Sequence, residues 1–204
     1  MAVKFEKELD CPLKSFLSLI YETSKYPKWF PFNKQSILLA QPGKAKKLIY
    51  LDNNIPVISN RDFLIYGFGV NKFESEKVIN CVVSSIDKIG FFKDLVDMQK
   101  RTKNVRGEIN IFGWEVKIIN SERLYIRGVM DIDPKLDFIP TFIVNVIGKE
   151  FAKNIFAIMI KIVKNYEGSE YQNKNPSSLD KQFYDFVEEE IKKLELPTTT
   201  LKID

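Results

Sequence analysis

The sequence predicts an α+β fold in which a curved antiparallel sheet wraps around one long helix near the C-terminal end of the chain. Short runs of alternating apolar and polar residues recur between residues 3 and 133, and most connections between them are short. Parallel strands would need crossovers of about a dozen residues or more, so we expect antiparallel pairing. An apolar helical stretch follows at residues 140–165, and the 16 Phe of the chain call for a large interior or an apolar guest.

The first two predicted elements are a strand and an amphipathic helix. Val3–Leu9 alternates apolar and charged residues, as a half-buried strand does. Asp10 is expected to cap the following helix, with Pro12 in its first turn. The apolar face of this helix consists of Leu13, Phe16, Leu17, Ile20 and Tyr21. The prolines of KYPKWFPF at residues 25–32 end it, because a residue before proline avoids helical geometry.

The middle of the chain is predicted to be a series of strands joined mainly by turns. Turn-forming residues stand at 41–43, 52–54 and 120–122, whereas residues 87–104 form a longer, mixed insertion. Strands and a few helices in this order indicate one sheet with helices packed against it. The predicted strands are Ser36–Ala40, Lys47–Leu51, Asp62–Val70, Lys77–Ile86, Val105–Ile119 and Arg123–Asp133.

The strand that begins SNRDFLIYGFGVN (residues 59–71) is apolar on both faces, so it must be covered on both. Arg61 and Asp62 at its start either fix the fold through charge-assisted hydrogen bonds or contact a ligand. Gly67 and Gly69 lie on the same face as Arg61. They either leave room for a cavity or mark a bulge that curls the sheet.

The C-terminal part is predicted to hold two helices. The first covers roughly residues 140–165, and its apolar positions surround most of its first half, so it must be buried on several sides. A polar linker at 167–178 precedes an amphipathic helix with Ser178 as its cap. We therefore expect a main domain at residues 1–166 and an appendage at 167–204.

Composition excludes several classes of function. The net charge of +4 is spread thinly, without the basic stripe that nucleic-acid binding requires. There is no histidine, and the two cysteines lie 70 residues apart, so neither a metal site, a cofactor nor a disulfide framework is predicted. No stretch resembles a secretory signal or a membrane span, and we expect a cytoplasmic protein that is monomeric.

Four segments together resemble the START lipid-transfer domains of the helix-grip superfamily. They are SNRDFLIYGFG (59–69), the Ser84-Ser85 strand end, VRGEINIFGWEV (105–116) and MDIDPKLDFIPTFIVN (130–145). The Arg-Asp-Phe opening and the Asp-Pro approach to the long helix are the specific parts. The likeness covers roughly Lys4 to Asn165, and it is closest to the phosphatidylcholine-transfer branch.

The resemblance implies a tunnel between the sheet and the long helix that holds one lipid, without catalysis or cofactor. Members commonly carry a second arginine six residues after the first, where this chain has Gly67, and the helix at 178–196 is extra to the usual domain. These two departures leave the lipid class open. The residues expected to contact the ligand are Arg61, Phe63, Ile65, Gly67, Arg106, Trp114, Tyr125, Arg127, Phe142, Asn145 and Met159.

The same resemblance implies a lid made of the 87–104 insertion and the long helix. In IGFFKDLVDM (89–98), apolar residues alternate with charged ones, which predicts transient insertion into a membrane interface. Nearby lysines and Arg101 would meet anionic headgroups. The expected lid residues are Phe91, Phe92, Leu95 and Val96.

Two other classes of function stay open at this stage. An enzyme of the wider superfamily would need acid and base groups inside the cavity, for which Glu108, Glu115 and Tyr125 are the candidates. A protein-interaction module would use the final helix as its docking surface. The lipid carrier is the reading that the residues and the resemblance favour.

Overall fold

The centre of the molecule is an eight-stranded sheet with the order β1-β8-β7-β5-β4-β3-β2, and β6 pairs with β4. The computed structural model describes residues 2–54, 59–86, 103–136 and 141–195. Neighbours along this order are antiparallel, and only the short β6 pairs in parallel. The strands are β1 (Ala2–Asp10), β2 (Asn33–Gly43), β3 (Lys46–Asn53), β4 (Arg61–Lys72), β5 (Val78–Ser85), β6 (Val105–Arg106), β7 (Glu108–Asn120) and β8 (Arg123–Asp133).

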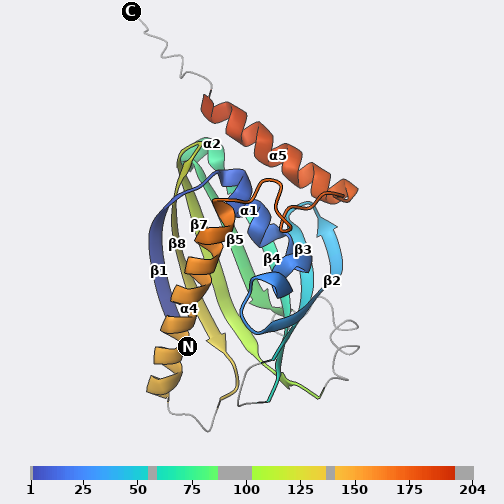
Figure 1. Cartoon of the computed structure of the whole chain (residues 1–204), viewed down its shortest axis with the longest axis vertical. Coiled ribbons are helices and arrows are strands. Elements are labelled where there is room, and N and C mark those ends of the chain that lie inside the picture. The colour runs from blue at the N-terminus through green and yellow to red at the C-terminus, as the bar shows by residue number, and fades with distance from the viewer. Residues whose placement is uncertain (1, 55–58, 87–102, 137–140, 196–204) are drawn as a thin grey trace, which may run out of the picture.

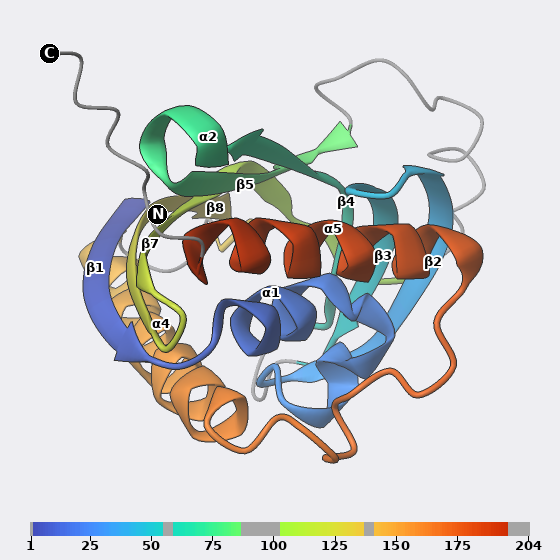
Figure 2. The same cartoon turned by 90° about the horizontal axis from the view of Figure 1, so that it is seen from above.

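The helices fill the concave side of this sheet, which confirms the predicted α+β, helix-grip architecture. Figures 1 and 2 show the sheet curving from β1 round to β2, with α4 running along β1 and with α1 and α5 across one end. That end is called the closed end below. The opposite end, where β4 and α4 begin, is called the entry end. The helices are α1 (Leu13–Tyr21), the 3-10 helix η1 (Thr23–Lys28), α2 (Phe73–Glu76), α4 (Thr141–Val163) and α5 (Ser178–Glu195).

Two predicted helix caps are wrong. Pro12, not Asp10, occupies the N-cap of α1, and no side chain caps that helix. At α5 the cap is Ser177 rather than Ser178. The Oγ of Ser177 accepts the backbone N–H of Asp180 at 3.2 Å, and the Asp180 carboxylate accepts the backbone N–H of Ser177 at 3.2 Å. This reciprocal pair is a capping box, with Asp in the place usually taken by Glu or Gln.

The predicted strands are confirmed with small changes. The strand predicted at 105–119 is divided at Gly107, because β6 pairs with the start of β4 while β7 joins β5 and β8. Gly107 allows close packing here, since a Cβ at this position would overlap the ring of Phe63. The predicted turn at 41–43 lies two residues later, at Lys44 and Ala45.

The main hydrophobic core lies toward the closed end. It joins α1, the later part of α4, α5 and the inner faces of β7 and β8. Phe5 packs against this core from the edge strand β1, with edge-to-face contacts to Trp114 and Phe156 at ring-centroid distances of 4.9 and 4.8 Å. The most deeply buried members are Leu13, Phe16, Leu19, Val116, Leu124, Ile126 and Met159.

Helix α5 is joined to α1 and β3 by stacking and by buried polar contacts. The rings of Tyr21 and Phe183 stack at 3.7 Å. The hydroxyl of Tyr21 donates to Asp180 at 2.8 Å, and the buried Lys47 ammonium donates to the carbonyl of Tyr21 at 3.0 Å. Phe183 and Val187 therefore belong to the same core as the residues of α1.

Candidate functional site

An apolar wall lines the concave face of the sheet toward the entry end. Ile49, Leu51, Ile65 and Ile109 form its buried base. The side chains packed on this base are only partly buried, and they come from neighbouring strands and from η1: Tyr26, Phe63, Val83, Phe112 and Ile132. Side chains that point inward from a sheet and stay partly accessible define a concave, greasy surface, which we call the inner wall.

Gly67 lies within the inner wall. Its register partners are Lys47 on β3 and Val83 on β5, and neither pairing has a register shift, through Phe68 for β3 and through Gly69 for β5. The glycines therefore mark no bulge. A Cβ at Gly67 would be in contact with Cγ2 of Val83 at 3.4 Å. Of the two alternatives from the sequence, the regular pairing argues against the bulge.

Arg61 is at the entry end of the same face and is 2% exposed. Its guanidinium donates to the backbone carbonyls of Pro134 and Lys135, both at 3.1 Å, and to that of Ser59. These acceptors tie the start of β4 to the segment that leads into α4. The observed contacts give Arg61 the structural role considered from the sequence.

Asp62 and Arg106 lie on the opposite face, where they join β4 to β6. Asp62 is completely buried, and Nε of Arg106 lies 2.5 Å from its Oδ1. The hydroxyl of Tyr50 also donates to Asp62, at 3.1 Å. Arg106 therefore does not face the inner wall as the sequence analysis expected.

Tyr125 and Arg127 are also on the outer face. The Tyr125 hydroxyl donates to Glu6 at 2.8 Å, and Arg127 pairs with Glu115 at 2.7 Å, in exposed positions. Their neighbours in β8, Leu124 and Ile126, are the fully buried, inward-facing residues. Strand alternation thus separates these two predicted ligand contacts from the wall.

The remaining predicted residues divide between core, surface and segments that are not described. Trp114 is packed between Phe5, Phe16, Phe112 and Phe156, and Met159 is 1% exposed in the main core. Phe142 is 70% exposed, so the expectation that it lines the cavity is wrong. Asn145 lies on α4, but its side chain is not among those described. The predicted lid residues 91, 92, 95 and 96 lie outside the described residues.

The sequence analysis missed the aromatic segment that packs against α4. Tyr26 contacts Trp29 at 5.3 Å and Phe30 at 6.3 Å, and Phe30 contacts Phe151 of α4 at 5.9 Å. Tyr26 also packs on the inner wall. The signal was present as four aromatic residues within KYPKWFPF, which had been interpreted only as a helix stop.

Few polar groups lie beside the inner wall and this aromatic segment within the described residues. Tyr26 donates its hydroxyl to the carbonyl of Ile20 at 2.6 Å, and burial raises its pKa. Burial also raises the pKa of Cys81, which shares the inner face with Trp114, to about 12. The buried Nε1 of Trp29 has no hydrogen-bond partner among these residues, and it is a donor that a ligand oxygen could use.

The described residues contain neither a metal site nor a membrane-spanning helix. No group of three or more Cys, Asp or Glu side chains there could hold a metal ion. Among the described helices, none is both long and apolar enough to cross a membrane.

The fold has many counterparts among solved structures, although no protein-family model and no curated protein sequence matches the chain. Human STARD10 superposes with a TM-score of 0.67 at 16% identity, over 81% of this chain and 64% of that one. Human StAR-related lipid transfer protein 5 gives 0.65 at 13% identity, over 81% and 76%.

An enzyme shares the same architecture. The Zhui aromatase/cyclase from Streptomyces sp. R1128 superposes with a TM-score of 0.53 at 10% identity, over 81% of this chain and 94% of that one. The likeness to all three structures lies in the fold, at identities too low to transfer an activity. The chain therefore has the helix-grip fold of the START domains.

Proposed function

We propose that the protein is a non-enzymatic lipid carrier that holds one amphiphile, a phospholipid, between the inner wall and α4. The observation that carries this proposal is the partly buried inner wall, with Gly67 in place of a large side chain at its centre. A carrier of this kind shields acyl chains from water at roughly 25 cal/mol per Å² of apolar area. The lipid-transfer proteins that share the fold support the same reading.

The wall is suited to acyl chains rather than to a charged headgroup. Its members are aliphatic and aromatic, and the nearby Arg61 is engaged by three backbone carbonyls. The headgroup would therefore remain toward the entry end. The indole N–H of Trp29, which has no partner among the described residues, is a candidate for contact with an ester oxygen of the ligand.

Catalysis is not favoured by the placement of the acidic and phenolic candidates. On the outer face, Glu115 pairs with Arg127, and the hydroxyl of Tyr125 donates to Glu6. Glu108 pairs with Lys135 at 2.9 Å. General acid–base chemistry needs such groups within hydrogen-bond reach of a substrate in the cavity. We therefore propose binding and transfer without turnover.

Transient contact with a membrane would take place at the start of α4. Phe142 and Val146 stand one helical turn apart and are 70% and 60% exposed, which is unusual for two large apolar side chains in a row. Lys149 follows on the next turn. An apolar tip beside a basic side chain fits the interface of an anionic bilayer. The lid at residues 91–96 and a cytoplasmic location remain predictions.

The test is a matched pair of glycine substitutions on opposite faces of the sheet. Gly67→Leu adds a large side chain to the inner wall. Gly113→Leu places the same side chain on the outer face, where a Cβ would meet nothing closer than 3.9 Å. Transfer of a fluorescent phosphatidylcholine, phosphatidylethanolamine or phosphatidylglycerol between vesicles is then measured for both variants and the parent protein.

Gly67→Leu is expected to slow transfer of the preferred lipid by about ten-fold or more, because a few methyl groups in an apolar site change affinity by about 10- to 200-fold. Gly113→Leu should transfer lipid at close to the parent rate. Equal transfer by both variants would show that the lipid does not occupy the inner wall. Absence of transfer by the parent protein, for all three lipids, would contradict the carrier.

A further inference from the structure

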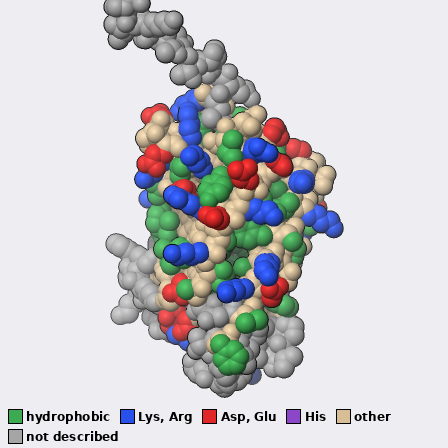
Figure 3. Space-filling view, turned by 90° about the vertical axis from the view of Figure 1, so that its left-hand side faces the viewer, with side chains coloured by type: hydrophobic (Ala, Val, Ile, Leu, Met, Phe, Trp, Pro, Cys, Tyr) green, Lys and Arg blue, Asp and Glu red, His purple; other side chains and the backbone are tan. Residues whose placement is uncertain are grey.

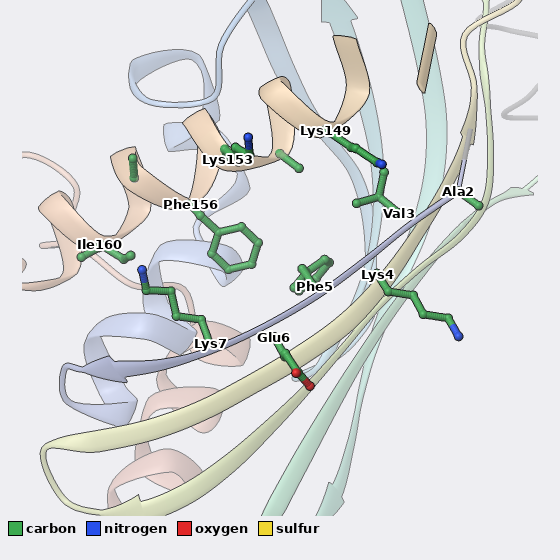
Figure 4. A pocket seen from close by; sticks show the side chains of 12 residues that line it. Ala2, Val3, Lys4, Phe5, Glu6, Lys7, Lys149, Lys153, Phe156 and Ile160 are labelled. Atoms are coloured by element: carbon green, nitrogen blue, oxygen red, sulfur yellow. The ribbon is translucent and has the colours of Figure 1, made fainter. Parts of the chain in front are cut away.

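A second space lies on the surface of the molecule, between the edge strand β1 and α4. It has a volume of about 520 Å³ and is lined only by residues 2–7 and by residues of α4 between 149 and 160. Volumes of about 300–1,000 Å³ are typical of small-molecule sites. Figure 4 shows Phe5 and Phe156 at the inner side of this space, where their rings are in edge-to-face contact at a centroid distance of 4.8 Å. We call this space the β1–α4 slot.

The slot is separate from the inner wall. None of the residues that line it belongs to the buried base of that wall. Phe5 stands between the two, since it also contacts Trp114 and Phe112 on the sheet side at 4.9 and 6.5 Å. Gly128 accommodates this position, because a Cβ there would overlap the Phe5 ring.

The dimensions of the slot fit one extended chain. Residues 2–7 span about 17 Å at 3.3 Å per strand residue. The α4 residues 149–160 span about 17 Å at 1.5 Å per helical residue, so the two walls have matching lengths. The side chains of Ala152 and Ala157 are small and project little from α4, so they leave the slot open on its helix side.

The rim of the slot is basic. Lys149 and Lys153 stand one turn apart at the end nearer Val3, and Lys7 lies at the other end near Ile160 (Figure 4). The carboxylate of Glu6 is directed to the outer face, where it accepts the Tyr125 hydroxyl. Lys153 contacts Glu150 at 2.5 Å in an exposed pair, a type of contact that contributes little.

The whole face has the same character. Figure 3, which views the molecule from the side of β1 and α4, shows basic side chains spaced around hydrophobic surface. Apolar side chains line the slot, and amino groups of long, flexible lysines surround it. This combination suits a ligand with one hydrocarbon chain and one negative charge.

We propose that the β1–α4 slot binds one long-chain fatty acid, with its chain along Phe5, Phe156 and Ile160 and its carboxylate at Lys149 and Lys153. This site is separate from the phospholipid site proposed on the inner wall, and the proposal does not depend on the proposed function. A chain that lies here would also cover the free edge of β1, which sheet proteins normally protect from pairing with other strands.

The experiment follows binding of oleate to the full chain by NMR, with a doxyl-labelled stearate to locate the bound chain. Broadening is expected at the amides of residues 2–7 and 149–160. Broadening confined to the amides of Ile49, Ile65 and Ile109 would place the fatty acid on the inner wall and overturn the proposal. Whether the protein carries a phospholipid is tested separately, by the lipid-transfer assay with Gly67→Leu and Gly113→Leu.

Two matched pairs of variants test the contacts. Ala152→Trp fills the slot, and Asn154→Trp places the same ring on an exposed position that does not line it. Ala152→Trp should raise the apparent Kd for oleate by about ten-fold or more, and Asn154→Trp by less than about two-fold. Ala157→Trp, at an exposed position, replaces Ala152→Trp if the latter lowers the melting temperature.

The charge is tested by Lys149→Glu with Lys153→Glu, compared with Lys161→Glu at an exposed position of α4 that does not line the slot. The double variant should weaken oleate binding by about ten-fold, as expected for loss of a charge-assisted contact, while methyl oleate is unaffected. Equal effects of the double variant and Lys161→Glu, or equal effects on oleate and its ester, would contradict the assigned headgroup site.

Discussion

The ring of Phe5 occupies the space that a side chain at Gly128 would fill, on the neighbouring strand. The same ring meets Phe156 of α4 and Trp114 of β7, so one aromatic residue joins three elements around the edge of the sheet. Gly128→Ala is expected to destabilise the protein by about 1–3 kcal/mol, the usual cost of forcing extra atoms into a packed site.

Gly113→Ala is the control for that substitution. Gly113 pairs with Val129 on β8, one residue along from Gly128, and an added Cβ would have ordinary contacts at 3.9 and 4.0 Å. The free energy of unfolding of Gly113→Ala, measured in urea, should stay close to that of the parent protein. Equal losses for the two variants would show that the Phe5 ring does not rest on Gly128.

The buried pair of Asp62 and Arg106 should be far more sensitive than the exposed pair of Glu115 and Arg127. Asp62→Ala leaves the half-buried Arg106 without its partner carboxylate, which for a buried pair costs about 3–5 kcal/mol. Glu115→Ala removes an acceptor on the surface, where solvent screens the loss. Urea unfolding of both variants checks this difference, and similar values would argue against burial of the β4–β6 joint.

We propose that residues 167–195 complete the same folding unit as the preceding part of the chain. Phe183 is buried against Tyr21, so Phe183→Ala should cost about 3–5 kcal/mol. Asp185→Ala, at an exposed position of the same helix, should change stability by no more than about 0.5 kcal/mol. Thermal unfolding monitored by near-UV circular dichroism distinguishes the two. A Phe183→Ala variant as stable as the parent would mean that α5 is an appendage.

Stability should fall at alkaline pH because of the cysteines. Burial raises the pKa of Cys11 and Cys81 from 9.0 to about 12. Between these values the unfolded chain loses the thiol protons and the folded chain keeps them, so the free energy of unfolding decreases as pH rises from about 9 towards 12. Replacing both cysteines with Ala should flatten the profile between about pH 9 and 10, below the range in which tyrosines whose pKa is raised by burial also contribute.

The same shift predicts slow alkylation of the native thiols. At pH 8 the thiolate fraction in the folded state is about a thousandth of that in the unfolded state, because the pKa differs by about three units. Iodoacetamide should therefore modify the native protein at least about 100-fold more slowly than the urea-unfolded chain. Rapid labelling of both thiols under native conditions would contradict the burial of Cys11 and the partial burial of Cys81.

The fold was accessible from the sequence because it depends on patterns that act locally. Alternation placed every long strand, whereas the expectation that the run DFLIYGFG is covered on both faces holds only for the first part of β4, since the strand is partly exposed from Tyr66 and exposed from Gly69. Helix ends were less predictable, since Ser177 and Ser178 have the same propensity and only the reciprocal bonds with Asp180 distinguish them.

The candidate site was harder to predict from the sequence, because its residues come from separate strands and the sequence does not give the register between them. Arg106, Tyr125 and Arg127 were expected to face the ligand as isolated polar residues in strands, but alternation places each on the outer face with a partner from a neighbouring strand. The closure by Tyr26, Phe30 and Phe151 depends on a contact across about 120 residues, which no local pattern reveals.

The measurement that tests the carrier most directly is native mass spectrometry of the freshly purified chain, with lipid extraction from the same sample. The account predicts one bound phospholipid per chain, retained by Gly113→Leu and lost or reduced in Gly67→Leu. A chain that carries no lipid, takes none up from vesicles and is unchanged by either substitution would contradict it.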